Sequence, residues 1–222
     1  GSVIENCVNT GVAAGYQAYI GGICGANEKN AAIVNCASYV SDTDGAVYRR
    51  VTGWGATGSY AGGLTGYNGG SIVFDKKSVV STRSVAGIVV GRDYVGGLVG
   101  YQEEGNYCLV KNSLNAGTVT SSQKHDNGGL VGYIDHDATC HYNVNSGKVS
   151  HGNAIIGDHK AAYTSGNNYF LESSGKGWPS TSISVSSGNF KKQSSFSSLD
   201  FNKIWTMGSN GPEPKNCSWR NL

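Results

Sequence analysis

A short motif, Gly-Gly-aliphatic-x-Gly, recurs along this 222-residue chain and constrains its fold more than any other feature. It occupies residues 21–25, 62–66, 96–100 and 128–132, and a decayed copy without the glycine pair occupies 153–157. Successive copies begin 41, 34, 32 and 25 residues apart. Repetition at this period is typical of stacked units, each too small to bury an apolar face alone.

A second element, Asn-x-x-Asn-x-Gly, lies between the copies. It occurs at residues 6–11 and 112–117, returns with Tyr142 in first place at 142–147, and has partial versions at 34–37 and 72–75. Each unit of roughly 30 residues then holds two or three short strands joined by tight turns. The sequence therefore predicts an all-β chain, a parallel β-helix or β-solenoid of about five imperfect repeats with a C-terminal cap.

Stacking in register predicts columns of equivalent side chains that point into the stack, one per coil. The motif residues of the aliphatic column are Ile23, Leu64, Leu98, Leu130 and Ile155. Small residues form a second column, Cys7, Cys36 and Ser113, and asparagines near a corner form an amide ladder, Asn6, Asn35, Asn112 and Asn143. Because parallel stacking aims Cys7 and Cys36 in the same direction, we expect them to be neighbours without a disulfide.

The repeats cover residues 3–172, and residues 173–222 form a Ser-rich segment followed by a capping region. An apolar cluster in that region contains Leu199, Phe201 and Trp205. We expect these three side chains to cover the open end of the stack, since an uncovered final coil exposes unpaired strand edges. The alternatives are docking on the side of the stack or contact with a partner domain.

Composition argues against several classes of function. Net charge is +2, and basic residues occur at most in pairs, so no nucleic-acid surface is expected. No run of about 18 apolar residues exists, so no membrane-spanning segment is expected. The six cysteines form no CxxC pair, and no cofactor motif is present.

Metal and acid–base chemistry are both weighed from the residues between 93 and 159. All five histidines lie at 125–159 among aspartates, and His136 and His141 are the pair that could meet, but we interpret them as solvated loop residues with no metal site. Stacking could align Asp93 or Glu103 with Asp135, as a glycoside-processing enzyme would require, yet the acids share no repeat position. Cys24 is replaced by Thr65, Val99 and Val131 in other copies, which favours packing over nucleophilic catalysis. No catalytic residue is assigned.

Aromatic residues are the best candidates for a binding surface. Tyr67, Tyr101 and Tyr133 follow the last glycine of three copies, so stacking would place them in one stripe. Trp54 lies in the longest segment between motifs. Aromatic rows suit contacts with sugars or proteins, and the alternative is that the tyrosines pack only along the stack.

The combination of Gly-Gly-Leu-Val-Gly-Tyr with Asn-Cys-x-Asn-x-Gly resembles the GLUG-motif repeat family over residues 3–172. Two units depart from it: Phe74-Asp75 replaces Asn-Cys, and residues 153–157 lack the double glycine. The resemblance implies a β-helical module of large surface or secreted proteins from bacteria, notably Bacteroidetes, and it supplies no catalytic residue.

From this resemblance we expect a non-enzymatic, extracellular or cell-surface binding or adhesion module of a larger protein. Its partners would be a glycan or another surface protein, together with further domains of its own chain. The alternatives are a structural spacer and a polysaccharide-active β-helix enzyme. Fold alone does not choose among them.

Overall fold

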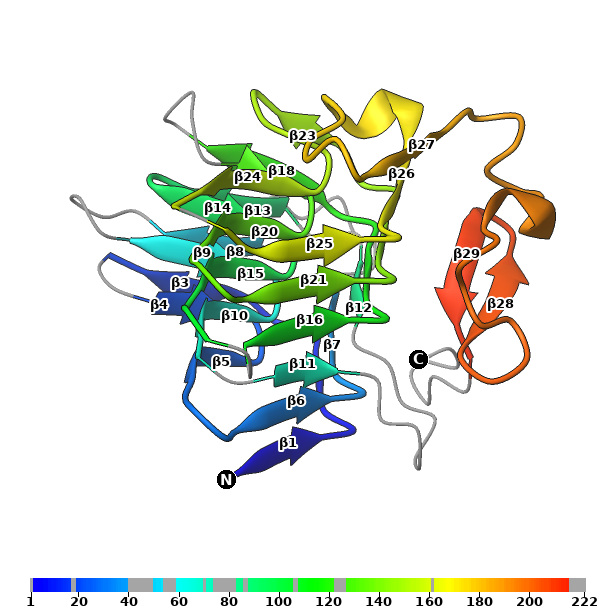
Figure 1. Cartoon of the computed structure of the whole chain (residues 1–222). Coiled ribbons are helices and arrows are strands. Elements are labelled where there is room, and N and C mark those ends of the chain that lie inside the picture. Colours follow the sequence, from blue (N-terminus) through cyan, green and yellow to red (C-terminus); the bar gives the residue numbers. More distant parts are fainter. Residues whose placement is uncertain are drawn as a thin grey trace.

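The computed structural model describes residues 2–16, 19–39, 50–53, 59–69, 71–73, 83–85, 88–105, 108–121, 127–160 and 162–215 (Figure 1). Across these ranges the chain is all-β, with two short 3-10 turns, η2 (Glu172–Ser174) and η3 (Gln193–Ser195). The same ranges contain no helix with the length and apolar character needed to cross a bilayer.

Five parallel sheets, A to E, account for most strands, and the chain visits them in the same order on each of its first four passes. The fifth pass has strands in sheets A, B, C and E and only an isolated bridge at Asn153 beside sheet D. Sheet A contains β1 (Val3–Glu5), β6 (Ala32–Val34), β11 (Ser71–Val73), β16 (Leu109–Lys111), β21 (Thr139–His141) and β25 (Thr164–Gly166). Sheet B contains β2 (Val8–Asn9), β7 (Ala37–Tyr39), β12 (Arg83–Val85), β17 (Leu114–Asn115), β22 (Val144–Asn145), β26 (Tyr169–Leu171) and β27 (Ile183–Val185).

The other three sheets complete each pass. Sheet C contains β3 (Ala13–Gly15), β8 (Arg50–Gly53), β13 (Ile88–Gly91), β18 (Thr118–Ser121) and β23 (Val149–Ser150). Sheet D contains β4 (Tyr19–Gly21), β9 (Tyr60–Gly62), β14 (Tyr94–Gly96) and β19 (Asn127–Gly128). Sheet E contains β5 (Cys24–Asn27), β10 (Thr65–Asn68), β15 (Val99–Gln102), β20 (Val131–Ile134) and β24 (Ile156–His159).

We call one pass from sheet A to sheet E a coil. In Figure 1 the strands of sheet A lie one above another in chain order, from β1 at one end to β25 at the other. The all-β, parallel architecture expected from the repeats is confirmed, and its strand order is compatible with a β-solenoid.

The aliphatic column predicted from the motif is present. The backbone N–H of Leu64 donates to the carbonyl of Leu98 at 2.9 Å, and the N–H of Leu98 donates to Leu130 at 2.9 Å. Equivalent 2.9 Å bonds join Ile23 to Leu64 and Leu130 to Ile155. Ile23, in the first coil, is partly buried, and the other four are fully buried in one apolar cluster.

The asparagine ladder differs from the prediction by one residue. Lys111 pairs with His141, so Asn112 lies opposite Tyr142, and Asn143 belongs to the column of Cys7, Cys36 and Ser113. The corner residues share a left-handed φ of 50–58°: Asn6, Asn35, Asn112, Tyr142 and Asn167. Asparagine suits this conformation best, but Tyr142 occupies it in one coil, so residue identity alone misaligns the repeat.

Cys7 and Cys36 occupy equivalent positions, since Val8 pairs with Ala37. Both thiols are free, as predicted, and so are Cys24, Cys108 and Cys140. Cys36 is buried and its thiol lies 3.3 Å from the carbonyl oxygen of Val34, to which it donates. Burial raises the pKa of Cys36 to about 11, which keeps the thiol protonated.

The C-terminal end of the stack is covered by residues 172–185, earlier in the chain than expected. The N–H of Ala154 donates to the carbonyl of Lys176 at 2.7 Å, and β27 pairs with β26 in sheet B. Trp178 packs against the main apolar cluster. Backbone groups at Ala154 and along β26, and apolar side chains near Trp178, are thereby partnered.

Leu199, Phe201 and Trp205 do not cover this end. Leu199 and Trp205 are buried, as expected, but they pack with Leu114, Val144 and Tyr169 of three neighbouring sheet-B strands. The next residue after Tyr169, Phe170, belongs to the main cluster, so Tyr169 faces outward from the stack. The capping expectation is wrong for these three residues, and docking on the side, the alternative above, is what the structure has.

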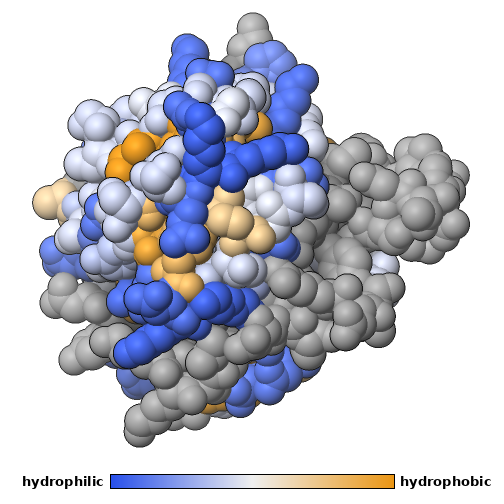
Figure 2. Space-filling model, turned by 90° about the vertical axis from the view of Figure 1, so that its right-hand side faces the viewer, coloured by the Kyte–Doolittle hydropathy of each residue, from blue (hydrophilic) through white to orange (hydrophobic). Residues whose placement is uncertain are grey.

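We call residues 186–215 the side cover. It contains η3 and an antiparallel hairpin, β28 (Trp205–Gly208) and β29 (Gly211–Pro214), which lies beside the stack in Figure 1. Figure 2 views the molecule from this side, and its coloured residues are mostly hydrophilic, with apolar residues visible between them. The cover thus hides an apolar sheet face that alternation in β17, β22 and β26 would otherwise expose.

Leu98→Ala should lower the free energy of unfolding by about 2–5 kcal/mol, because it removes a fully buried side chain and leaves a cavity. Val12→Ala, on an exposed side chain of the first coil, should change it by less than about 0.5 kcal/mol. Urea denaturation followed by circular dichroism measures both. Equal effects of the two substitutions would contradict the register of the aliphatic column.

A double-mutant cycle tests the side cover. Trp205→Ala and Val144→Ala share one cluster and should couple by about 0.5–3 kcal/mol, whereas Trp205→Ala and Leu98→Ala should add to within about 0.5 kcal/mol. The free energies of unfolding of the three single variants, the two double variants and the unmodified protein give both values. Additivity in the first pair, or strong coupling in the second alone, would place Trp205 elsewhere.

Candidate functional site

The motif builds an edge where sheet D turns into sheet E. Residues 60–67 and 94–101 both read Tyr-x-Gly-Gly-Leu-x-Gly-Tyr, with the first tyrosine in sheet D and the last in sheet E. The first coil has Tyr19 but Ala26, and the fourth has Tyr133 but no tyrosine at position 126. The predicted stripe of Tyr67, Tyr101 and Tyr133 is therefore one of two rows of tyrosines at this edge.

We call the six tyrosines of this edge the tyrosine ladder: Tyr19, Tyr60 and Tyr94 in sheet D, and Tyr67, Tyr101 and Tyr133 in sheet E. In the sheet-E row, ring centroids are 5.9 Å apart for Tyr67 and Tyr101 and 5.4 Å apart for Tyr101 and Tyr133, with interplanar angles of 3° and 6°. Register and stacking of the three predicted tyrosines are thus as expected.

The two rows also pack against each other. Ring centroids lie 4.9 Å apart for Tyr19 and Tyr67, 5.1 Å for Tyr60 and Tyr101, and 4.6 Å for Tyr94 and Tyr133. These spacings are those of favourable aromatic pairs. Since rings cover one another's faces along the row, the ladder presents mainly ring edges and hydroxyl groups to a ligand. The sheet-D row was missed, although a tyrosine two residues before the glycine pair repeats in three copies.

Glycines bring the two rows together. A Cβ on Gly66 would lie 2.4 Å from the backbone nitrogen of Ile20, and one on Gly100 would lie 2.8 Å from that of Ala61. We call this backbone contact the glycine seam: Gly62, Gly96 and Gly128 of sheet D, and Gly66, Gly100 and Gly132 of sheet E. Only residues without a Cβ permit this approach.

Carboxylates border the sheet-E row. The hydroxyl of Tyr101 donates to Asp135 Oδ2 at 2.8 Å, and Tyr67 is hydrogen-bonded to Glu103. Burial and these carboxylate partners raise the pKa of both tyrosines well above the usual value, so the hydroxyls remain protonated donors.

Gln102 pairs with Ile134, which places Glu103 and Asp135 at equivalent positions, as anticipated for Glu103. Asp93, the alternative, lies between sheets C and D.

A buried amide ladder lies on the inner side of the same strand ends. Asn27 Nδ2 donates to Asn68 Oδ1 at 2.7 Å, and Asn68 Nδ2 donates to Gln102 Oε1 at 2.8 Å. The next position is Ile134, which offers no acceptor, and Gln102 Nε2 is buried without a partner. The ladder fixes the strand ends from which the tyrosines and carboxylates project.

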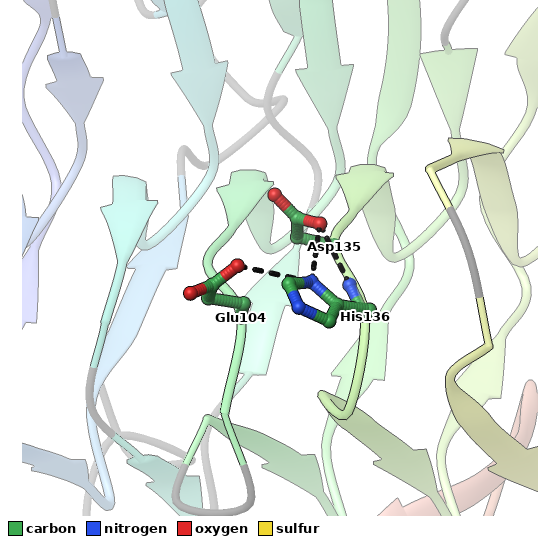
Figure 3. Close-up of side chains that lie close together, drawn as sticks. All are labelled: Glu104, Asp135 and His136. Carbon is green, nitrogen blue, oxygen red and sulfur yellow. Dashed lines mark hydrogen bonds and ion pairs between the residues drawn. The ribbon is translucent and has the colours of Figure 1, made fainter.

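At one end of the carboxylate border, Glu104, Asp135 and His136 converge (Figure 3). His136 Nδ1 lies 3.0 Å from Asp135 Oδ1 and 3.0 Å from Glu104 Oε2. We call these three residues the triad. They are the group of metal-ligating side chains found within the described parts of the chain.

The carboxyl of Asp135 is held ionised. Burial opposes its charge, but hydrogen bonds from the side chain and backbone of His136 and from Tyr101, together with the nearby Lys160 ammonium, lower its pKa to about 2. The bond with Asp135 raises the pKa of His136 despite partial desolvation, and the charge of Glu104 adds to this. The triad therefore places two carboxyl groups, that of Asp135 ionised, around one imidazole.

His141 does not meet His136. Its Nδ1 lies 3.1 Å from the carbonyl oxygen of Gly166, and burial lowers its pKa. The side chains that lie beside His136 and could share a metal ion with it are instead Glu104 and Asp135, and sequence reasoning did not consider Glu104 for this role. The register supplied a signal, since Glu104 and His136 each follow the aligned Glu103 and Asp135 by one residue.

The remaining sequence candidates lie apart from this edge. Cys24 pairs with Thr65 in sheet E, and burial raises the pKa of its thiol, in keeping with a packing role. Trp54 lies outside the described residues. A hollow of about 820 Å³ lies at the C-terminal end, where Val149, Asn153, Asp158, Glu172 and Lys176 are among the lining residues, and it contains none of the predicted site residues.

No match to this chain was found among protein-family models, curated proteins or solved structures. The resemblance to GLUG-motif repeats therefore rests on the sequence motifs alone.

Gly100→Ala should destabilise the protein by at least ~2 kcal/mol, because the added Cβ would lie 2.6 Å from the carbonyl oxygen of Gly66. Gly188→Ala is the control, since a Cβ there would meet no atom within 4 Å. Thermal unfolding measures stability, and near-ultraviolet circular dichroism reports tyrosine packing. If Gly100→Ala matches Gly188→Ala in both measurements, the two strands are not in backbone contact.

Proposed function

We propose that the chain is a non-catalytic β-solenoid module that binds a glycan through the tyrosine ladder and its carboxylate border. The observation that carries this proposal is the pair of adjacent tyrosine rows, three rings in each, with hydrogen-bonded carboxylates bordering the sheet-E row. The resemblance to GLUG-motif repeats suggests the setting, an extracellular or surface-attached bacterial protein with further domains.

The chemistry of the edge favours a polyhydroxylated ligand. Tyrosine hydroxyls repeat along the row, so a linear polymer could meet the same group in successive coils, and Glu103 adds one partly exposed carboxylate. Ring edges supply apolar contact. Sugar hydroxyls can donate to the Glu103 carboxylate and to the tyrosine oxygens, because the hydroxyl hydrogens of Tyr67 and Tyr101 are already donated to carboxylates. A large apolar partner surface would find little exposed ring face here. A surface protein is the second ligand class to be tested.

The same geometry gives little support to an enzyme. A glycosidase needs a carboxylic acid that holds its proton near neutral pH, opposite a second carboxylate. Asp135 has the reverse property, since its pKa is lowered to about 2, and it is engaged by Tyr101 and His136. A structural spacer would need no such edge, and glycan binding separates that alternative from ours.

The test is the paired variant Tyr67→Phe with Tyr101→Phe, which keeps the stacked rings and removes two hydroxyls. A glycan array identifies a ligand, and titration calorimetry should then show affinity reduced about 10-fold or more, since two hydrogen bonds are lost at roughly 0.5–1.5 kcal/mol each. Tyr16→Phe is the matched control, because Tyr16 is exposed and belongs to no ladder contact in the described structure.

Unchanged affinity in the paired variant would move the binding site away from the ladder. Absence of any glycan ligand, with capture of a defined surface protein that Tyr67→Phe and Tyr101→Phe abolish, would favour the second ligand class. Absence of both would favour the spacer.

A further inference from the structure

We infer that Glu104, Asp135 and His136 form a binding site for a divalent transition-metal ion of the zinc type. The inference does not rest on the proposed glycan binding, although Asp135 and Tyr101 take part in both sites. It rests on the mixed donor set, on the orientation of Asp135, and on the backbone contacts that hold the donors in two successive coils.

The donor set suits such an ion. One imidazole nitrogen and two carboxylate oxygens are common ligands of zinc, with a water molecule completing the tetrahedron. The ligand atoms lie within 4.8 Å of one another, and two of the three separations involve His136 Nδ1 at 3.0 Å. Ligands at roughly 2.0–2.2 Å from a tetrahedral ion are a little over 3 Å apart. Small side-chain rotations therefore bring the triad to coordination distance.

Asp135 is oriented for this role by groups outside the triad. Its Oδ2 accepts the hydroxyl hydrogen of Tyr101 at 2.8 Å and lies 3.4 Å from Lys160 Nζ. Its Oδ1 accepts the backbone N–H of His136 at 2.8 Å and lies 3.0 Å from His136 Nδ1, so its second lone pair is the one available to a metal. Metal-ligating carboxylates are often hydrogen-bonded in this way on their second oxygen. Lys160 neutralises part of the local charge, but it approaches from the Oδ2 side.

The backbone fixes both turns that carry the donors. The N–H of Asp135 donates to the carbonyl of Gln102 at 2.9 Å, and the N–H of Gly105 donates to the carbonyl of His136 at 3.2 Å. Gly105, with φ of 123°, and Asp137, with φ of 60°, shape the two turns. The donors therefore require little ordering on binding, and precise support of this kind favours a metal site.

Access is open on the solvent side. The side chain of Asp135 is 5% exposed, whereas those of His136 and Glu104 are 39% and 55% exposed. When His136 carries a proton on Nδ1, this N–H can donate to the neighbouring carboxylates, and metal binding releases the proton to solvent. Zinc binding would replace this proton, with the imidazole nitrogen lone pair and the two carboxylates as donors.

The experiment is calorimetric titration of the full chain with Zn²⁺ at pH 7.5, with Co²⁺ as a spectroscopic probe. We expect one zinc ion per chain, weakened at least 10-fold by His136→Gln and by Glu104→Gln. His159→Gln is the matched control, since His159 has a similar exposure and a single nearby carboxylate, Asp158. Melting curves establish that the variants remain folded.

The cobalt spectrum addresses binding by thiols, because Cys7 is exposed. Coordination by the triad gives no thiolate-to-cobalt charge-transfer band. Absence of stoichiometric zinc binding, a charge-transfer band, or full binding by folded His136→Gln would each overturn the inference. Loss of zinc with retained glycan affinity, or the reverse, separates this site from the proposed function.

Discussion

The contact of backbone against backbone along the glycine seam is the constraint on which the rest of this structure depends. Sheets D and E approach so closely that Gly66 and Gly100 have no room for a Cβ. One consequence is that the apolar interior is divided into two clusters of side chains. Leu64, Leu98 and Val99 pack in the main cluster, whereas Ala61 and Val95 belong to a separate cluster with Val89 and Val119. The other consequence is the tyrosine ladder, because rows from different sheets can touch only where the backbones between them are close.

Much of the architecture could be predicted because repetition gives several independent readings of one position. The aliphatic column and the alignment of Cys7 with Cys36 follow from the fixed spacing within motifs. Backbone pairing between neighbouring coils places residues with the same motif position beside one another. Where a motif is degenerate, this reasoning weakens. Tyr142 replaces the usual corner asparagine, and alignment by residue identity then moves Asn143 into the wrong column.

The side cover illustrates a limit of a different kind. The apolar residues near Leu199 and Trp205 predict that these side chains are buried, but the local sequence does not indicate which part of the protein they pack against. The answer lies in sheet B, where Leu114, Val144 and Tyr169 make the outward face apolar over three successive strands. Likewise, Glu104 and His136 are 32 positions apart in the sequence and become neighbours only through the register of sheet E. Contacts between elements are the part of the structure that a single sequence leaves least determined.

The placement of the side cover has a mechanical consequence. Its apolar contacts reach strands β17, β22 and β26, which belong to the later passes of the chain, while β1 to β5 have a neighbour on one side each. Tension along the stack would break interstrand bonds coil by coil. A coil whose strands pack against the side cover can open only after those apolar contacts are lost as well. Under load, the coils that contain β17, β22 and β26 should therefore resist opening more than described coils without such contacts.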